Sequence, residues 1–230
     1  MGTDDLFRKR KEQKAADLAR KIQARPQGLR YLIICEGGKT EPNYFRELCA
    51  DLRLRTAQVR VEPGALGSSP SRVVEYAENL FNQDALGGDP FDKVFCVFDR
   101  DRHEDFFPAI KHIEQLGIDQ KPFEAIVSVP CFEYWLLLHF VNIRQAFHPA
   151  GKKSVCDSVI RELRKQPGFK QYSKGRKDIY GTVRNNTGTA INRAEQAEKD
   201  AKITGEDNPS TRIHHLVALL QKLADNTASE

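Results

Sequence analysis

Short apolar runs alternate with amphipathic stretches along the first 130 residues. Four runs have strand length, are rich in β-branched and aromatic residues, and lack helical periodicity, which predicts buried strands. They are Tyr31–Cys35, Gln58–Glu62, Lys93–Phe98 and Phe123–Ser128. The intervening stretches predict helices over about Pro42–Leu54, Ser71–Gln83 and Glu104–Leu116. Strands that alternate with helices of this size predict an α/β fold with a mostly parallel sheet flanked by helices.

The pattern changes after Pro130. Phe132–Val141 is apolar on nearly all sides and predicts a buried helix. Further helices are predicted over Ser154–Lys165, Gly175–Arg184, Thr189–Ile203 and Thr211–Leu223. We therefore divide the chain into a basic arm or helix (1–29), an α/β domain (30–130) and a C-terminal helical extension (131–226) packed on the sheet.

Composition narrows the class of protein. A chain of 230 residues is long enough for one α/β domain with an extension. No stretch has the length of a membrane span, and the charged N-terminus lacks the apolar core of a signal peptide, so we expect no membrane association. Five cysteines without a Cys-x-x-Cys pair argue against thiolate zinc sites and a disulfide framework. These features favour a reducing compartment, the cytoplasm.

Acidic residues follow two of the predicted strands directly. Glu36 comes after Tyr31–Cys35, and Asp99 and Asp101 come after Lys93–Phe98. Ligands of open α/β sheets bind beyond the carboxyl ends of the strands, so these acids face one crevice. Asp99 and Asp101 point to the same side of an extended chain and repel unless a cation or proton lies between them. Their hard oxygens suit Mg²⁺ or Mn²⁺, although solvated loop acids give the same pattern.

Three further residues extend this candidate site, each with an alternative role. Glu41 is either a metal ligand or a favourable acid in the first turn of the next helix. Lys39 either pairs with a phosphate oxygen or is a solvated turn residue. Glu133 lies in the apolar helix, where a carboxylate is costly unless it is paired or binds metal. Its alternative is a structural salt bridge to Arg30 or Arg100.

Basic residues are concentrated in two segments, Arg8–Arg25 and Lys152–Arg184, whereas Asp89–Glu114 is acidic. An acidic metal crevice flanked by cations suits cleavage of a polyanion. The second segment interleaves aromatic residues with bases, which favours contacts with nucleic acid backbone and stacking on unpaired bases. The predicted substrate-binding residues there are Lys174, Arg176, Lys177, Tyr172 and Tyr180. The alternative for both segments is a solvated helix face.

Four strings place these residues in a wider pattern. A strand that ends in Glu-Gly, followed by one that ends in Asp-x-Asp, is similar to the Toprim domain of topoisomerases, primases and overcoming-lysogenization-defect nucleases. The longer strings resemble the RloB-like family, a Toprim-like group encoded beside restriction-modification and abortive-infection genes in bacteria. They are Cys35–Phe45, Phe98–Asp101, Pro130–Phe140 and Asn208–Thr211. The resemblance spans about Arg30 to Leu223.

This resemblance implies a Toprim-like fold and a metal-dependent nuclease that acts in phage defence with an ABC- or AAA-type ATPase as partner. In that pattern Glu36 is a metal ligand or a general acid or base, and Glu133 belongs to the site. The aromatic and basic segment favours RNA over DNA as substrate. One alternative is a non-catalytic nucleotide- or nucleic-acid-binding sensor that regulates a defence ATPase. Another is a primase-like nucleotidyl transferase, which uses the same acids.

Overall fold

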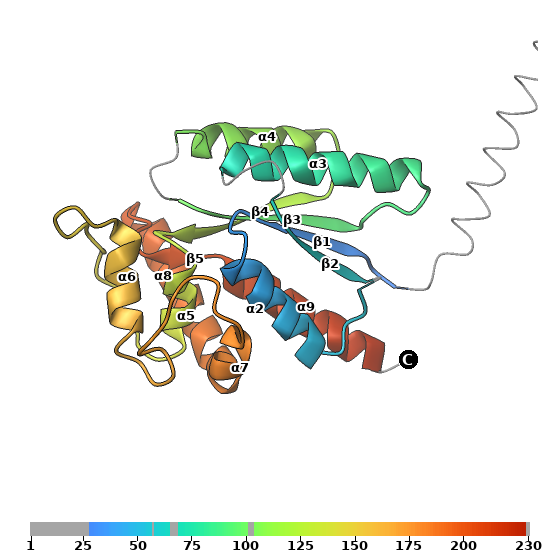
Figure 1. Cartoon of the computed structure of the whole chain (residues 1–230). Helices are drawn as coiled ribbons and strands as arrows, with labels where there is room; N and C mark the ends of the chain where they lie inside the picture. The colour runs from blue at the N-terminus through green and yellow to red at the C-terminus, as the bar shows by residue number, and fades with distance from the viewer. Residues whose placement is uncertain (1–27, 57, 65–68, 101–103, 229–230) are drawn as a thin grey trace, which may run out of the picture.

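The computed structural model describes residues 28–56, 58–64, 69–100 and 104–228 (Figure 1). Its centre is a five-stranded sheet in the order β2-β1-β3-β4-β5. Four strands are parallel, and β5 (Ser210–Thr211) runs antiparallel to β4. The parallel strands are β1 (Tyr31–Cys35), β2 (Val59–Pro63), β3 (Lys93–Asp99) and β4 (Phe123–Val129). The predicted fold class is confirmed, and the arrangement is consistent with a Toprim-like or Rossmann-like sheet.

Helices cover both faces of this sheet (Figure 1). One face carries α3 (Pro70–Leu86) and α4 (Phe106–Ile118), and the other carries α2 (Thr40–Asp51) and α9 (Ile213–Ala228). Alternate residues of β1 enter opposite cores: Leu32 and Ile34 on the side of α3 and α4, Ile33 on the other side. Burial on both faces explains why the strand sequences are apolar throughout instead of alternating.

The chain after β4 builds short helices that enlarge the core on the α2 side. They are α5 (Glu133–Leu138), α6 (Val155–Leu163), α7 (Ile179–Val183), the 3₁₀ helix η1 (Arg184–Asn186) and α8 (Thr187–Thr204). Ser154 and Asp157 form a capping box that starts α6. Apolar residues of α5, α8 and α9 share one core with β1 and α2. Within the described ranges, no helix is long and apolar enough to cross a membrane.

Three details differ from the predictions. The residues of β5 were expected to start a helix. A strand of two polar residues has no periodicity of its own, and it forms only because the tertiary fold pairs it with β4. Helix α7 starts later than Gly175, since the backbone of Asp178 is left-handed. Cys131, just before α5, and Cys156, in α6, form a disulfide with their Cα atoms 5.8 Å apart. The cysteine pattern of the sequence had argued against disulfides. The other cysteines are free and buried.

Candidate active site

Glu36 and Asp99 lie side by side where β1 and β3 end. The backbone N–H of Glu36 donates to the carbonyl of Val97 at 2.8 Å, which continues the β1–β3 ladder by one residue. The backbone N–H of Asp99 donates to Oε2 of Glu36 at 3.1 Å. The parallel pairing of two adjacent strands therefore brings these two acids to one edge of the sheet, as their positions after the strands predicted.

Glu41 joins them from the first turn of α2. Its carboxylate lies so close to the preceding turn that a Cβ atom on Gly37 would stand 2.0 Å from its Oε2. A glycine is thus required at position 37 for this placement of Glu41. The neighbouring Gly38 has open space around it, with nothing within 4 Å of an added Cβ.

The acids are close enough to affect one another's pKa values. Burial raises the pKa of Asp99 well above its usual value, and repulsion from Glu41, Glu133 and Glu36 adds to the effect. Burial also raises the pKa of Glu41 to about 7, with further contributions from Glu133 and Glu36. Lys174 opposes both shifts. Glu41 and Asp99 are half-buried residues, in keeping with burial as the main cause of both shifts.

The chemistry of these donors suits a divalent cation. Converging carboxylates repel one another, and their repulsion is relieved either by protons or by a bound cation. The donors are all oxygen atoms, which is the chemistry that Mg²⁺ and Mn²⁺ prefer. Asp101, the other predicted ligand, lies outside the described residues.

A search of curated proteins and a search of solved structures found no match to this chain. A family model does match it, over residues 31–220, and its description is RloB-like protein. The chain belongs to the RloB-like protein family. The matched span contains Glu36, Glu41, Asp99 and Glu133, so the acidic site lies within the part of the chain that defines this family membership.

Glu133 of this RloB-like chain is deeply buried, with 1 % of its surface exposed, at the start of α5. Its Oε1 accepts a hydrogen bond of 3.0 Å from the hydroxyl of Tyr172 and lies 3.9 Å from Nζ of Lys174. Its Oε2 lies 3.3 Å from Sγ of Cys156. The hydrogen bond from Tyr172 and the nearby charge of Lys174 offset the cost of burying the carboxylate, and they connect α5 to the segment before α7.

The alternative partners predicted for Glu133 are wrong. Arg30 directly precedes β1, so it lies at the opposite end of this strand from Glu36. It forms ion pairs with Asp84 and Asp89. Arg100 forms an ion pair with Asp207. Arg100 therefore points away from the crevice that Asp99 faces, as the alternation of an extended chain requires.

The segment around Gly175 lies on the turn between β1 and α2. Its backbone N–H donates to Oγ1 of Thr40 at 2.9 Å, and a Cβ atom on Gly175 would stand 2.8 Å from Cδ of Lys39. This contact brings Lys39 and Lys174 to the rim of the acidic site. Both lysines are exposed, and the side chain of Lys174 keeps 61 % of its surface accessible. Lys174 thus lies close enough to the acids to oppose the pKa shifts of Glu41 and Asp99.

The prediction that Tyr172 and Tyr180 stack on unpaired bases is wrong for this structure. Tyr172 is 1 % and Tyr180 is 5 % exposed, so neither ring offers a free face. Tyr180 packs edge-on against Tyr44 with ring centroids 5.6 Å apart, and its hydroxyl donates to Asp51 at 3.3 Å. Both aromatic residues belong to the core, whereas Lys174 and Lys177 face solvent.

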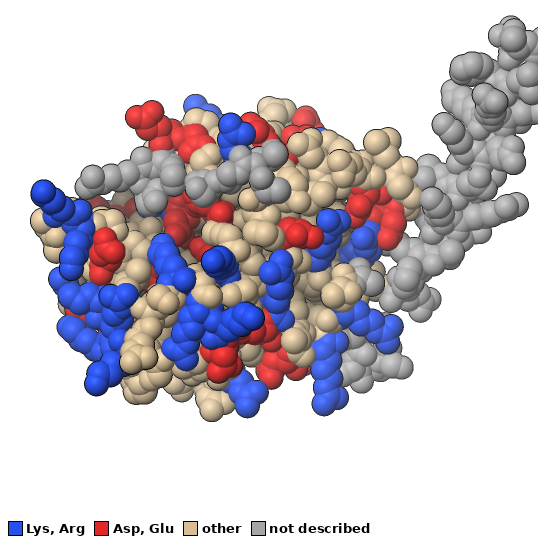
Figure 2. Space-filling model, viewed as in Figure 1, with Lys and Arg blue, Asp and Glu red and all other residues tan. Residues whose placement is uncertain are grey.

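The two remaining predicted cations, Arg176 and Lys177, differ in their surroundings. The guanidinium of Arg176 lies 5.4 Å from the ring centroid of Phe169, and its Nη2 donates to Oγ1 of Thr182 at 3.2 Å. Lys177 is exposed. Figure 2 shows Lys and Arg side chains gathered on the face formed by α2, α6 and α7, with acids between them. Lys177 is available to a polyanion, whereas Arg176 has a structural role.

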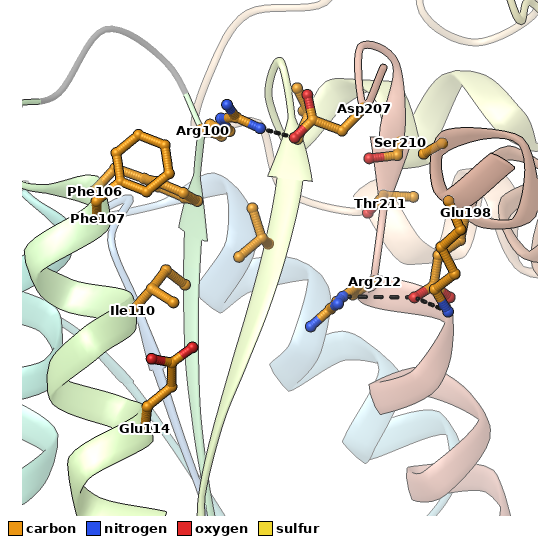
Figure 3. Close-up of a pocket in the computed structure, with 14 residues that line it drawn as sticks. Arg100, Phe106, Phe107, Ile110, Glu114, Glu198, Asp207, Ser210, Thr211 and Arg212 are labelled. Atoms are coloured by element: carbon orange, nitrogen blue, oxygen red, sulfur yellow. Dashed lines mark ion pairs between the residues drawn. The ribbon is translucent and has the colours of Figure 1, made fainter. Parts of the chain in front are cut away.

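A pocket of about 420 Å³ lies away from the acids, between α4 and the α8–β5 segment (Figure 3). Phe106, Phe107 and Ile110 form its apolar wall. The cations that line it are paired: Arg100 with Asp207, and Arg212 and Lys202 with Glu198. This pocket is not the candidate active site, because Glu36, Glu41, Asp99 and the exposed lysines beside them do not line it.

Proposed function

We propose that this RloB-like protein is a Mg²⁺- or Mn²⁺-dependent nuclease that hydrolyses phosphodiester bonds. The observation that carries the proposal is the meeting of Glu36 and Asp99 at the ends of adjacent strands, beside Glu41 in the first turn of α2, where burial and the charge of Glu36 raise the pKa of both Glu41 and Asp99. Such an arrangement is unfavourable for folding and is therefore expected where function requires it.

Glu36, Glu41 and Asp99 would hold the cation, together with Asp101. When bound, the cation would supply Lewis acid chemistry: it lowers the pKa of a bound water and stabilises charge that develops on the phosphoryl oxygens. Burial raises the pKa of Glu41 to about 7, so Glu41 would release a proton when the cation binds near neutral pH. Lys39 and Lys174 would pair with non-bridging phosphate oxygens. Glu133 would position Lys174 through their 3.9 Å contact.

The substrate of this proposed nuclease is nucleic acid bound through its backbone. The preference for RNA depended on stacking by Tyr172 and Tyr180, and the burial of both rings removes that argument. Exposed lysines at positions 39, 174 and 177 recognise phosphates in RNA and DNA alike. Action in phage defence beside an ABC- or AAA-type ATPase follows from the family resemblance, and we keep it as part of the proposal.

One observation favours the second candidate, a non-catalytic sensor of nucleotides or nucleic acid. Lys174 already opposes the repulsion among the acids, so the fold has a built-in cation beside them. A crevice of this kind could bind a ligand without cutting it. The two candidates differ in the product: a sensor binds and releases intact ligand, whereas a nuclease leaves shorter chains.

The decisive experiment incubates the purified chain with Mg²⁺ or Mn²⁺ and labelled RNA, single-stranded DNA or duplex DNA. We expect metal-dependent cleavage of at least one substrate and a loss of at least about 100-fold in rate for Glu36→Gln and Asp99→Asn. Glu62→Gln is the matched control, because Glu62 is a partly exposed acid on β2 that pairs with Arg60. Equal cleavage by all variants would refute the proposal. Binding with no cleavage under any condition would support the sensor.

A further inference from the structure

A carboxylate and two imidazoles meet where α8 contacts the start of α9. Nε2 of His215 lies 2.7 Å and Nε2 of His214 lies 3.5 Å from the same oxygen, Oε2 of Glu198. One ligand atom from each of the three residues lies within 4.8 Å of the others. None of these residues belongs to the acidic site at the ends of β1 and β3.

His214 points to a missing partner. It is 2 % exposed, and neither of its ring nitrogens makes a hydrogen bond of ordinary geometry within the part of the chain that the structure describes. Buried polar atoms are nearly always paired, so an unpaired imidazole requires an explanation. Burial, and then the neighbouring His215, lowers the pKa of His214 to about 4, against smaller opposing effects of Glu198 and the Thr211 backbone.

The surroundings of Glu198 orient its carboxylate. Lys202 Nζ lies 3.1 Å and Arg212 Nε lies 3.6 Å from Oε1, so these cations hold one oxygen and leave Oε2 to the histidines. Figure 3 shows the ion pair between Arg212 and Glu198. Their charge weakens binding of any cation, which disfavours Mg²⁺ and Ca²⁺ and leaves ions that bind imidazole strongly. An open pocket of about 260 Å³, lined in part by Glu198, Arg212 and His215, gives an ion access.

We propose that Glu198, His214 and His215 form a site for zinc or a similar first-row transition-metal ion, separate from the acidic site. Two histidines and one carboxylate are a known donor set for such ions, and they leave a coordination position for water. Separations of 2.7 Å and 3.5 Å need only a small shift of the exposed His215 to admit an ion at bond lengths of about 2 Å. An ion here would fasten α8 to α9 and stabilise the folded chain.

The test uses the full chain, treated with a chelator and then titrated with zinc chloride by calorimetry and in thermal unfolding. We expect the wild-type chain to bind zinc and to unfold at a higher temperature in its presence. His215→Ala should weaken zinc binding by at least about 100-fold, because even outer-shell changes cost 10- to 100-fold. Glu198→Gln should do the same. His215 is half-exposed, so its removal leaves the core intact.

Three control variants separate this site from other zinc ligands. His112→Ala removes an imidazole from a comparable group, in which Glu78 contacts His112 at 2.9 Å and Lys121 at 2.6 Å without a second histidine. The double variant Cys131→Ser/Cys156→Ser removes both sulfurs of the disulfide beside Glu133, and Glu36→Gln changes the acidic site. All three should keep the zinc binding that His215→Ala loses. Wild-type zinc affinity in His215→Ala, or no zinc binding by the wild-type chain, would overturn the proposal.

Discussion

The backbone N–H of Asp99 holds Oε2 of Glu36 at 3.1 Å across the neighbouring ends of β1 and β3. The donor is a main-chain group, so a change of the Asp99 side chain leaves it in place. It fixes the Glu36 carboxylate at the crevice while the Asp99 carboxyl group remains available to a ligand. Substitution of Asp99 by Asn therefore tests the chemistry of the side chain without moving Glu36.

The raised pKa of Glu41 predicts an unusual dependence of stability on pH. The folded chain keeps the proton of Glu41 up to about pH 7, whereas the usual value is 4.5. Between these values the folded state binds more protons than the unfolded state, so stability falls as pH rises through this window. Glu41→Gln should remove that fall and stabilise the chain at pH 8 by about 1–3 kcal/mol, since one pKa unit corresponds to about 1.4 kcal/mol.

Urea denaturation at pH 5 and pH 8 measures this effect, with Glu62→Gln as the control acid. Glu41→Gln and the wild-type chain should differ more at pH 8 than at pH 5, and Glu62→Gln should follow the wild-type chain. Identical pH profiles for Glu41→Gln and the wild-type chain would mean that Glu41 is an ordinary first-turn acid.

A divalent cation should restore the stability that the chain loses when Glu41 ionises. Mn²⁺ competes with protons for the acids, so it should stabilise the chain at pH 8 more than at pH 5. At ten times its dissociation constant the gain is about 1.4 kcal/mol, or roughly 3–6 °C in melting temperature for a chain of this size. Chelation should reverse the gain, and Asp99→Asn should reduce it. A rise in melting temperature that is independent of pH would assign the ion to another site.

The sequence allowed a direct prediction of the strands and of the acids that follow them. β1 and β3 are buried on both faces, which leaves continuous apolar runs, and parallel strands end at one edge of the sheet. Glu36 and Asp99 could thus be placed together. Strand β5 could not be predicted, because its two polar residues are paired only through β4.

The roles of Tyr172 and Tyr180 depend on contacts far along the chain, to Glu133 and to Tyr44. A local pattern of aromatic and basic residues does not distinguish a stacking surface from a segment whose rings enter the core. The group of Glu198, His214 and His215 was missed for a similar reason, since its members lie on two helices that meet only in the fold. The buried position of His214 is the signal that the structure adds.

Gly37 and Gly38 form a matched pair for the role of Glu41. A methyl group at Gly37 would stand 2.0 Å from the Glu41 carboxylate, whereas Gly38 has free space. The Glu41 side chain can rotate away, so Gly37→Ala should fold but lose its placement of that carboxylate. We expect Gly37→Ala to weaken Mn²⁺ binding about 10-fold or more and Gly38→Ala to leave it unchanged. Calorimetry on both variants decides, and equal affinities would exclude Glu41 as a ligand.

In the basic segment before α7, Lys174 and Lys177 should bind substrate, whereas Arg176 should support the fold. Lys174 and Lys177 are exposed, so changing either to Gln should weaken nucleic acid binding and lower the slope of log affinity against log salt by roughly 0.7–0.9 per lost phosphate contact. The Lys174→Gln and Lys177→Gln variants should fold as stably as the wild-type chain, because exposed charges contribute little to stability. Lys111→Gln is the control, since Lys111 is an exposed lysine on α4, across the sheet from this segment.

Arg176→Gln should behave differently from these lysine variants. Its guanidinium packs on Phe169 and donates to Thr182, so its loss should cost about 1 kcal/mol of stability. Its effect on the salt slope should be smaller than that of Lys177→Gln, because the guanidinium is already engaged. Binding measured by fluorescence anisotropy from low to high salt, beside urea denaturation, separates the two roles. A salt slope that Lys174→Gln and Lys177→Gln leave unchanged would return both lysines to the class of solvated surface residues, and the acidic site would then need another path for the phosphate backbone.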